Sequence, residues 1–86
     1  MKIKFIPRAQ KTYRKLSLSI QRKTDKSLLF LIKDPKHPSL HTKKMKAKEN
    51  VWEARIDYQY RFTFIKKKAT YFILSIGPHD TGLGKK

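Results

Sequence analysis

The first part of the chain changes from strand-like alternation to a helical spacing of its apolar residues. Ile3 and Phe5 alternate with lysines, which predicts a short strand whose two apolar side chains point the same way. Pro7 follows and is well placed in the first turn of a helix. The apolar face of this helix is expected to consist of Ala9, Tyr13 and Leu16.

A second, longer helix is predicted directly after the first. Ser17 or Ser19 is a suitable N-cap, and Pro35 disfavours helical geometry at Asp34, where we expect the helix to end. Its buried face is expected to comprise Ile20, Thr24, Leu28 and Leu31. Two prolines in residues 34–39 then break regular structure, but this segment is too short to link two domains.

The second half of the chain has the aromatic and β-branched composition of strands. Alternating lysines over residues 43–48 predict an edge strand, since lysines commonly guard sheet edges against further pairing. Three more strands are expected over residues 51–58, 60–65 and 69–76. Period-two alternation places three groups of residues on shared faces: Trp52, Ala54 and Ile56; Tyr60, Phe62 and Phe64; and Phe72, Leu74 and Ile76.

The same alternation predicts how two of these strands pair. Keeping the apolar groups of the first two strands side by side requires a register whose simplest form places Arg55 directly opposite Arg61. Like charges at such a position destabilise an antiparallel pair, so we infer that the two guanidinium groups hold an anion such as phosphate. The alternative is that the arginines pair with acids, and three acids lie downstream of Glu49: Glu53, Asp57 and Asp80.

The net charge of the chain predicts that this small sheet protein attracts polyanions. The chain has 22 Lys and Arg against 6 Asp and Glu, a formal charge of +16. Its 86 residues predict a single domain over residues 1–86, and an apolar fraction of 38% favours a folded core over a disordered basic tail. Cysteine is absent, which excludes a disulfide framework and a thiolate zinc site.

The sequence pattern predicts a cytoplasmic protein without a membrane span. The longest apolar run covers residues 28–32, far short of the ~20 residues that a membrane helix needs. The residues at the N-terminus alternate between apolar and charged side chains, unlike the continuous apolar segment of a signal peptide.

The end of the last predicted strand presents a second candidate for chemistry. Gly77 and Pro78 turn the chain there, and His79 and Asp80 follow. Histidine transfers protons near neutral pH, so His79 is a candidate general acid or base; the alternative is a surface histidine beside a turn-capping Asp80.

Four side chains offer metal-ligating atoms: His37, His41, His79 and Asp80. Their spacing matches no compact ligand motif, and we predict neither a metal nor another cofactor.

The densest cluster of positive charge is a candidate surface for RNA. It consists of Lys43, Lys44, Lys46 and Lys48, and lysine clusters bind nucleic-acid backbones without reading sequence. The alternative is a solvated face, and we favour the first cluster over a second one at residues 66–68. Trp52 has the ring to stack on a base, but its alternation with Ala54 and Ile56 favours a core position.

Five short phrases follow the predicted strand and two helices in a fixed order: His37-Pro38-Ser39-Leu40, Lys43-Lys44-Met45, Trp52-Glu53-Ala54-Arg55, Tyr60-Arg61-Phe62-Thr63-Phe64 and Ile76-Gly77-Pro78-His79-Asp80. This ordered set resembles the RelE/ParE toxin superfamily of bacterial toxin–antitoxin systems along nearly the whole chain, and RelE-like members especially. The resemblance implies an α+β domain in which two N-terminal helices pack on a twisted, mainly antiparallel sheet of about four strands.

For function, the resemblance implies a type II toxin that cuts messenger RNA on the ribosome, inhibits translation and is neutralised by a cognate antitoxin protein. Arg61 matches the family's phosphate-stabilising arginine and Arg55 a basic active-site position. His79 matches the catalytic position after the last strand, where Asp80 would orient it. The lysines that lie where family members engage ribosomal RNA are Lys43, Lys44 and Lys46. Such an endoribonuclease needs no metal, because the substrate's own 2′-hydroxyl attacks the adjacent phosphate.

Two departures from the family pattern favour a histidine-centred mechanism. Glu53 occupies a position where some RelE members place a basic catalytic residue, and no tyrosine follows His79. Two other functions stay open: ParE-type inhibition of DNA gyrase, and non-catalytic binding of RNA or the ribosome. The pairing of His79-Asp80 with two arginines favours the nuclease over the gyrase inhibitor, and a non-catalytic binder would not need His79.

Overall fold

A computed structural model describes residues 1–46 and 48–78 of the chain. The elements follow one another as β1 (Lys2–Phe5), α1 (Pro7–Lys15), α2 (Leu18–Lys33), the 3₁₀ turn η1 (Pro38–Leu40), β2 (Lys43–Lys44), β3 (Trp52–Arg55), β4 (Tyr60–Lys67) and β5 (Thr70–Pro78). The predicted catalytic residues His79 and Asp80 lie outside the described residues.

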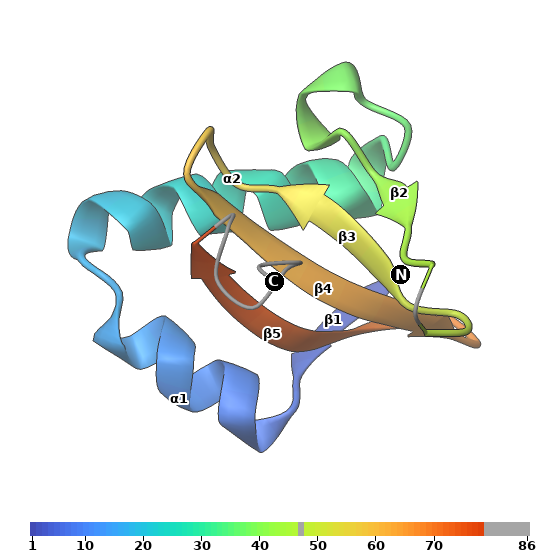
Figure 1. Ribbon diagram of the computed structural model, residues 1–86, viewed down its shortest axis with the longest axis horizontal. Helices are drawn as coiled ribbons and strands as arrows, with labels where there is room; N and C mark the ends of the chain where they lie inside the picture. Colours follow the sequence, from blue (N-terminus) through green and yellow to red (C-terminus); the bar gives the residue numbers. More distant parts are fainter. Residues whose placement is uncertain (47, 79–86) are drawn as a thin grey trace.

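The strands form one mixed sheet, with the two helices packed against it (Figure 1). The strand order is β1-β5-β4-β3-β2, in which β1 runs parallel to β5 and every other pair is antiparallel. The predicted α+β class is confirmed. The sheet has five strands rather than about four, because β1 joins the outer side of β5 after a connection through both helices.

Both helices begin where local sequence signals predict, and α2 ends at Lys33, directly before the predicted end at Asp34, whereas Leu16 of the predicted first helix is the C-cap of α1. Pro7 occupies the first turn of α1, and the Ser17 hydroxyl accepts a hydrogen bond from the backbone N–H of Ile20 at 3.2 Å, capping α2. The Tyr13 hydroxyl donates to a carboxylate oxygen of Asp25 at 2.7 Å, which joins α1 to α2. This hydrogen bond, with burial and the negative charge of Asp25, raises the pKa of Tyr13. No helix of the described residues is long and apolar enough to cross a membrane.

The core lies between the helices and one face of the sheet. Leu31 of α2 and Phe62 of β4 are each only 1% exposed, and Ala9 of α1 is fully buried. The rings of Phe64 and Tyr71 meet edge to face, with their centroids 5.5 Å apart. Because these core residues fix the orientation of β3 and β4, the alternate side chains of both strands lie on the opposite face of the sheet. The buried cluster also includes Leu28, Leu40, Ala54, Ile56, Ile73 and Ile76.

The predicted core position of Trp52 is wrong. Its side of β3 is the core side, since Ala54 on the same face is fully buried, yet Trp52 is 37% exposed. Trp52 lies at the first residue of β3, opposite Lys44 in the two-residue edge strand β2. An edge strand of that length leaves the outer side of the indole uncovered.

The predicted shared face of Phe72, Leu74 and Ile76 is also wrong. Thr63 of β4 pairs with Ser75, whereas its neighbour Phe64 pairs with Ile73, so Leu74 is an extra residue in a β-bulge. The bulge changes the phase of the alternation by one residue. The core side of β5 therefore consists of Tyr71, Ile73 and Ile76.

The lysine-rich edge strand is shorter than predicted. β2 is an edge strand, as expected, but it contains only Lys43 and Lys44 of the predicted residues 43–48. The backbone N–H of Met45 donates to the carbonyl of Val51 at 2.8 Å, so the chain already turns back there. Asn50 takes a left-handed conformation (φ 62°) that asparagine tolerates well, which closes this turn.

Candidate phosphate-binding site on the open face of the sheet

The predicted register of β3 and β4 is confirmed. Ala54 pairs with Phe62, and the next pair along the strands is Arg55 with Arg61. Because Ala54 and Phe62 are held in the core, both arginine side chains emerge on the opposite face. Burial of the apolar face thus brings two guanidinium-bearing residues together on neighbouring strands.

Glu53 lies in the same face and contacts two cations. Its side chain is 4% exposed, and its Oε1 atom lies 3.9 Å from an Arg61 guanidinium nitrogen and 3.8 Å from the Lys43 ammonium. The predicted alternative of an acid partner therefore holds for Arg61. Asp57 pairs instead with Lys23, at 3.3 Å. Both Glu53 contacts are longer than a hydrogen bond, so the carboxylate is held there mainly by charge.

Arg55 carries a buried donor that lacks a protein partner. Its Nε atom is buried, and no described residue accepts a hydrogen bond from it. Leaving such a donor unsatisfied costs roughly 1–3 kcal/mol. The backbone of Arg55 is firmly placed, since its carbonyl accepts a hydrogen bond from the Ser27 hydroxyl of α2 at 3.2 Å. An anion bound between the arginines would supply the missing acceptor.

A pocket of about 190 Å³ opens beside these charges. Glu53 and Arg61 line it from one side, and the hydroxyl groups of Thr63 and Ser75, 2.6 Å apart, line it from β4 and β5. The other lining residues are Ile76, Gly77 and Pro78. The pocket thus combines a cation, a carboxylate and hydroxyl groups, which are the groups that phosphate chemistry uses.

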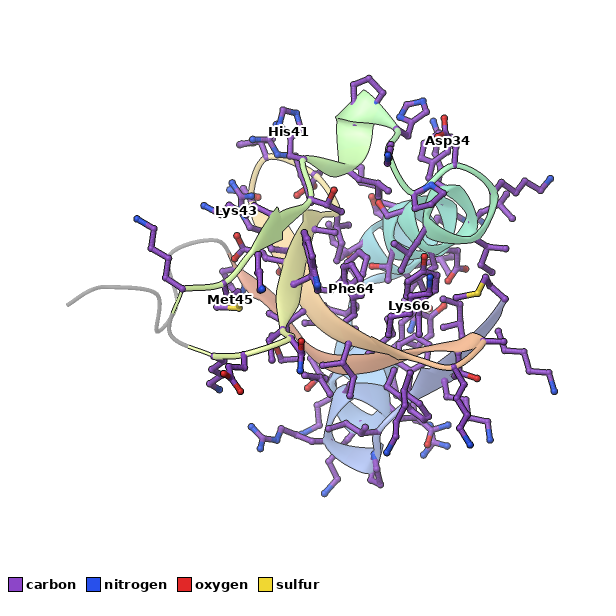
Figure 2. All side chains as sticks on the ribbon, turned by 90° about the vertical axis from the view of Figure 1, so that its right-hand side faces the viewer. Asp34, His41, Lys43, Met45, Phe64 and Lys66 are labelled. Carbon is purple, nitrogen blue, oxygen red and sulfur yellow. The ribbon has the colours of Figure 1, made fainter. Side chains whose placement is uncertain are left out.

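The four predicted RNA-binding lysines do not form one surface. Lys43 faces the pocket side of the sheet, where it contacts Glu53. Lys44 lies opposite Trp52, and together with Lys46 and Lys48 it borders a separate hollow of about 330 Å³. Figure 2 shows Lys43 and Met45 following each other along this edge of the molecule. The structure therefore separates Lys43, which lies beside Glu53, from the three lysines that border the second hollow.

Of the predicted catalytic residues, Arg55 and Arg61 are brought together, whereas His79 and Asp80 lie outside the described residues. Pro78, which precedes His79, lines the pocket. Within residues 1–46 and 48–78, no three His, Asp or Glu side chains gather as metal ligands would.

The sequence suggested Glu53 as a possible acid partner of the arginines but not as a catalytic residue. The signal was present, because the alternation that places Arg55 on the charged face of β3 places Glu53 there as well. What alternation cannot show is how deeply a charged residue is buried. The carboxylate of Glu53 is a functional candidate because it lies almost fully covered between two cations.

Compared by sequence, the chain matches no family model and no curated protein. Its structure is similar to a YoeB/ParE toxin from Agrobacterium tumefaciens, with a TM-score of 0.79 and 14% identity over 92% of this chain and 99% of that one. The isolated RelE toxin of E. coli gives a TM-score of 0.73 at 20% identity, covering 94% of this chain and 86% of the toxin.

A third similar structure is the toxin in an archaeal RelE–RelB complex from Pyrococcus horikoshii. Its TM-score is 0.73 at 17% identity, covering 94% of this chain and 97% of that chain. The protein therefore has the fold shared by RelE, YoeB and ParE toxins. The resemblance seen in the sequence is confirmed at the level of the fold.

Proposed function

We propose that this protein is the toxin of a toxin–antitoxin pair and that it cuts messenger RNA on the ribosome. The observation that supports this most directly is the pairing of Arg55 with Arg61 on the open face of the sheet, where Arg61 and the buried carboxylate of Glu53 line a pocket. Two opposed guanidinium groups lower stability on their own, and a phosphodiester between them offsets that cost. The similarity to RelE and YoeB toxins makes RNA the expected source of the phosphodiester.

The proposed reaction begins with the 2′-hydroxyl of the nucleotide before the cut. Glu53 accepts the 2′-hydroxyl proton while the 2′-oxygen attacks the phosphorus, and Arg55 and Arg61 stabilise the negative charge of the phosphorane. His79, oriented by Asp80, gives a proton to the 5′-oxygen as the P–O5′ bond breaks. The products are a 2′,3′-cyclic phosphate and a 5′-hydroxyl. The roles of His79 and Asp80 rest on the sequence.

The proposal includes an antitoxin protein as partner. Toxins of similar structure have been seen in complexes named RelE–RelB and YoeB–YefM. A net charge of +16 favours an acidic partner segment, since opposite charges speed association and select against wrong partners. Lys44, Lys46 and Lys48, which are all exposed, are the proposed contacts with ribosomal RNA. These partners would place the protein in the cytoplasm.

The test is a purified translation reaction in which the ends of a reporter message are mapped with and without ribosomes. We expect ribosome-dependent cuts by the unchanged protein. Arg61→Ala should slow cutting by about 10²–10³-fold, the usual effect of removing one preorganised donor to a developing anion. Glu53→Gln and His79→Ala should each slow it by about 10²–10⁴-fold, because each removes a proton-transfer group.

The matched control is Arg22→Ala, which removes the same charge from an exposed position on α2. It should cut at the unchanged rate. Undiminished cutting by Arg61→Ala and His79→Ala together would disprove the assignment. A parallel supercoiling assay covers the ParE-type alternative: an intact message with inhibited gyrase would replace the nuclease with a gyrase inhibitor.

A further inference from the structure

A second, larger cavity lies on the other side of β3 from the proposed cleavage pocket. It has a volume of about 480 Å³, is open to solvent and is lined by α2, the turn η1 and the residues that follow β3. Ile56 contributes a buried apolar wall, and the other lining residues are Lys23, Lys26, Ser27, Phe30, His37, Ser39 and Asp57. The cavity thus combines cations with aromatic rings, and the proposed reaction uses none of its residues.

Two stacked rings form the aromatic part of the cavity. The rings of Phe30 and His37 are 4.0 Å apart and within 11° of parallel. The Nδ1 atom of His37 accepts a hydrogen bond from the backbone N–H of Ser39 at 3.0 Å. In a neutral imidazole the proton then lies on Nε2, which is a donor. His37 is therefore held as a flat, oriented ring, neither fully buried nor fully exposed.

The side chains that line the cavity carry a net positive charge. Asp57 is the lone acid in its lining, and this carboxylate is already paired with Lys23 at 3.3 Å. The other Asp57 oxygen accepts from the backbone N–H groups of Gln59 and Tyr60, at 2.9 and 2.8 Å. Lys26, whose ammonium lies 6.0 Å from the centre of the Phe30 ring, remains exposed beside the stacked rings.

We propose that this cavity binds one nucleotide of single-stranded RNA, with its base against the His37 ring and its phosphate near Lys26. Flat aromatic surfaces next to cations are the usual way in which proteins hold unpaired nucleotides without reading sequence. An acidic peptide would satisfy the lysine but would leave the ring face and the apolar wall of Ile56 without a matching group.

The proposal rests on the proposed function and extends it to the neighbouring nucleotide. Asp57 follows Arg55 by two residues, so their Cα atoms are at most about 7 Å apart. The two arginines and the cavity lie on opposite sides of β3, so in this proposal the RNA strand held between Arg55 and Arg61 passes around the end of β3 to reach the cavity. The occupant is a nucleotide that flanks the cut, which would raise affinity for the substrate without taking part in the reaction.

The experiment measures binding of a fluorescent, 2′-O-methylated RNA hexamer, which cannot be cut, by anisotropy at fixed salt. His37→Ala should weaken binding about fivefold or more, the lower range for losing one base–aromatic stack. His37→Phe keeps a flat ring on Phe30 and should retain most of the affinity. Lys26→Gln should weaken binding and reduce its salt dependence. The control Lys33→Gln removes an equal charge elsewhere on α2 and should change binding less.

Repeating these measurements in an Arg61→Ala background separates this inference from the proposed function. The effect of His37→Ala on hexamer binding should persist in that background. In the protein with Arg61 intact and a cleavable message, His37→Ala should raise KM while kcat stays unchanged. A hexamer without bases that binds as tightly as the normal hexamer would overturn the proposal, as would unchanged binding by both His37→Ala and Lys26→Gln. An acidic peptide that competes with RNA only when His37 is present would assign the cavity to a protein ligand instead.

Discussion

The two faces of the sheet bury side chains to a similar depth but with different consequences for stability. On the helix side, Phe62 is 1% exposed, and on the other side its near neighbour Glu53 is 3% exposed. Burying the phenyl ring stabilises the fold by roughly 1.5–3 kcal/mol. Burying a carboxylate beside arginines gains little net stability, because the desolvation of each charge opposes their attraction. The helix side is arranged for folding, whereas the charges on the open side fit the anion binding that we propose.

The largest effect should come from breaking the helix side. Phe62→Ala removes a buried ring that contacts Phe64, with their centroids 5.7 Å apart, and we expect a loss of about 3–5 kcal/mol in the free energy of unfolding. The next residue provides the comparison. Thr63→Ala removes only a hydroxyl paired with Ser75 on the open face and should cost about 0.5–1.5 kcal/mol. Urea unfolding monitored by circular dichroism measures both.

Equal losses for Phe62→Ala and Thr63→Ala would contradict the distinction between the faces. The assay in translation adds a second measurement. Thr63 lines the pocket beside Glu53 and Arg61, so under the proposed function Thr63→Ala should slow cutting more than its small cost in stability predicts.

The sequence predicts the part of this arrangement that depends on simple alternation. Ala54 and Phe62 each alternate with charged or polar residues, so the register that buries both also sets Arg55 opposite Arg61. The helices follow for a similar reason, since Pro7 and Ser17 mark their first turns with local chemistry that tertiary contacts do not override.

The features that the sequence did not predict depend on contacts outside a single strand. The bulge at Leu74 interrupts the alternation of β5, and no local residue signals it. Trp52 is exposed because of the shortness of its neighbour β2 rather than because of its own pattern. The depth of Glu53 depends on strands β2 and β4 on either side. The roles of His79 and Asp80 stay predictions.

A smaller effect, with the opposite sign, should come from the open face. Arg55→Leu removes one of two opposed cations together with a buried Nε donor that no described residue satisfies. We expect the variant to be more stable by about 1–3 kcal/mol, because that unsatisfied donor disappears. The same variant should lose cleavage. Urea unfolding measures the gain in stability, and the translation assay measures the loss of cleavage.

The control for Arg55→Leu is Arg22→Leu on the exposed surface of α2, where the stability change should stay within about 0.5 kcal/mol. A destabilised Arg55→Leu protein would mean that the arginine pair supports the fold. Side chains on the open face would then stabilise the fold, as those on the helix side do.

The smallest effect is expected beyond the end of β3, at the ion pair between Lys23 of α2 and Asp57. Burial raises the pKa of the Asp57 carboxyl, but the backbone N–H groups of Tyr60 and Gln59 and the Lys23 ammonium together outweigh it and hold this pKa below its ordinary value. A lowered pKa in the folded state means that the charged carboxylate stabilises the fold above the ordinary pKa of aspartate, near pH 4. That stabilisation is lost as the pH falls through the lower, folded-state value.

Asp57→Asn isolates this charge, because an asparagine oxygen can still accept from the N–H groups of Gln59 and Tyr60. Above about pH 5 the variant should be less stable than the unchanged protein by about 0.2–1 kcal/mol, the usual range for a pair with one exposed partner. The difference should shrink as the pH falls below about 4, where aspartate in the unfolded chain becomes protonated. Urea unfolding of both proteins from pH 7 to pH 3 measures the difference. A gap that stays constant over this range would mean that hydrogen bonding of the turn, rather than the charge of Asp57, joins α2 to the end of β3.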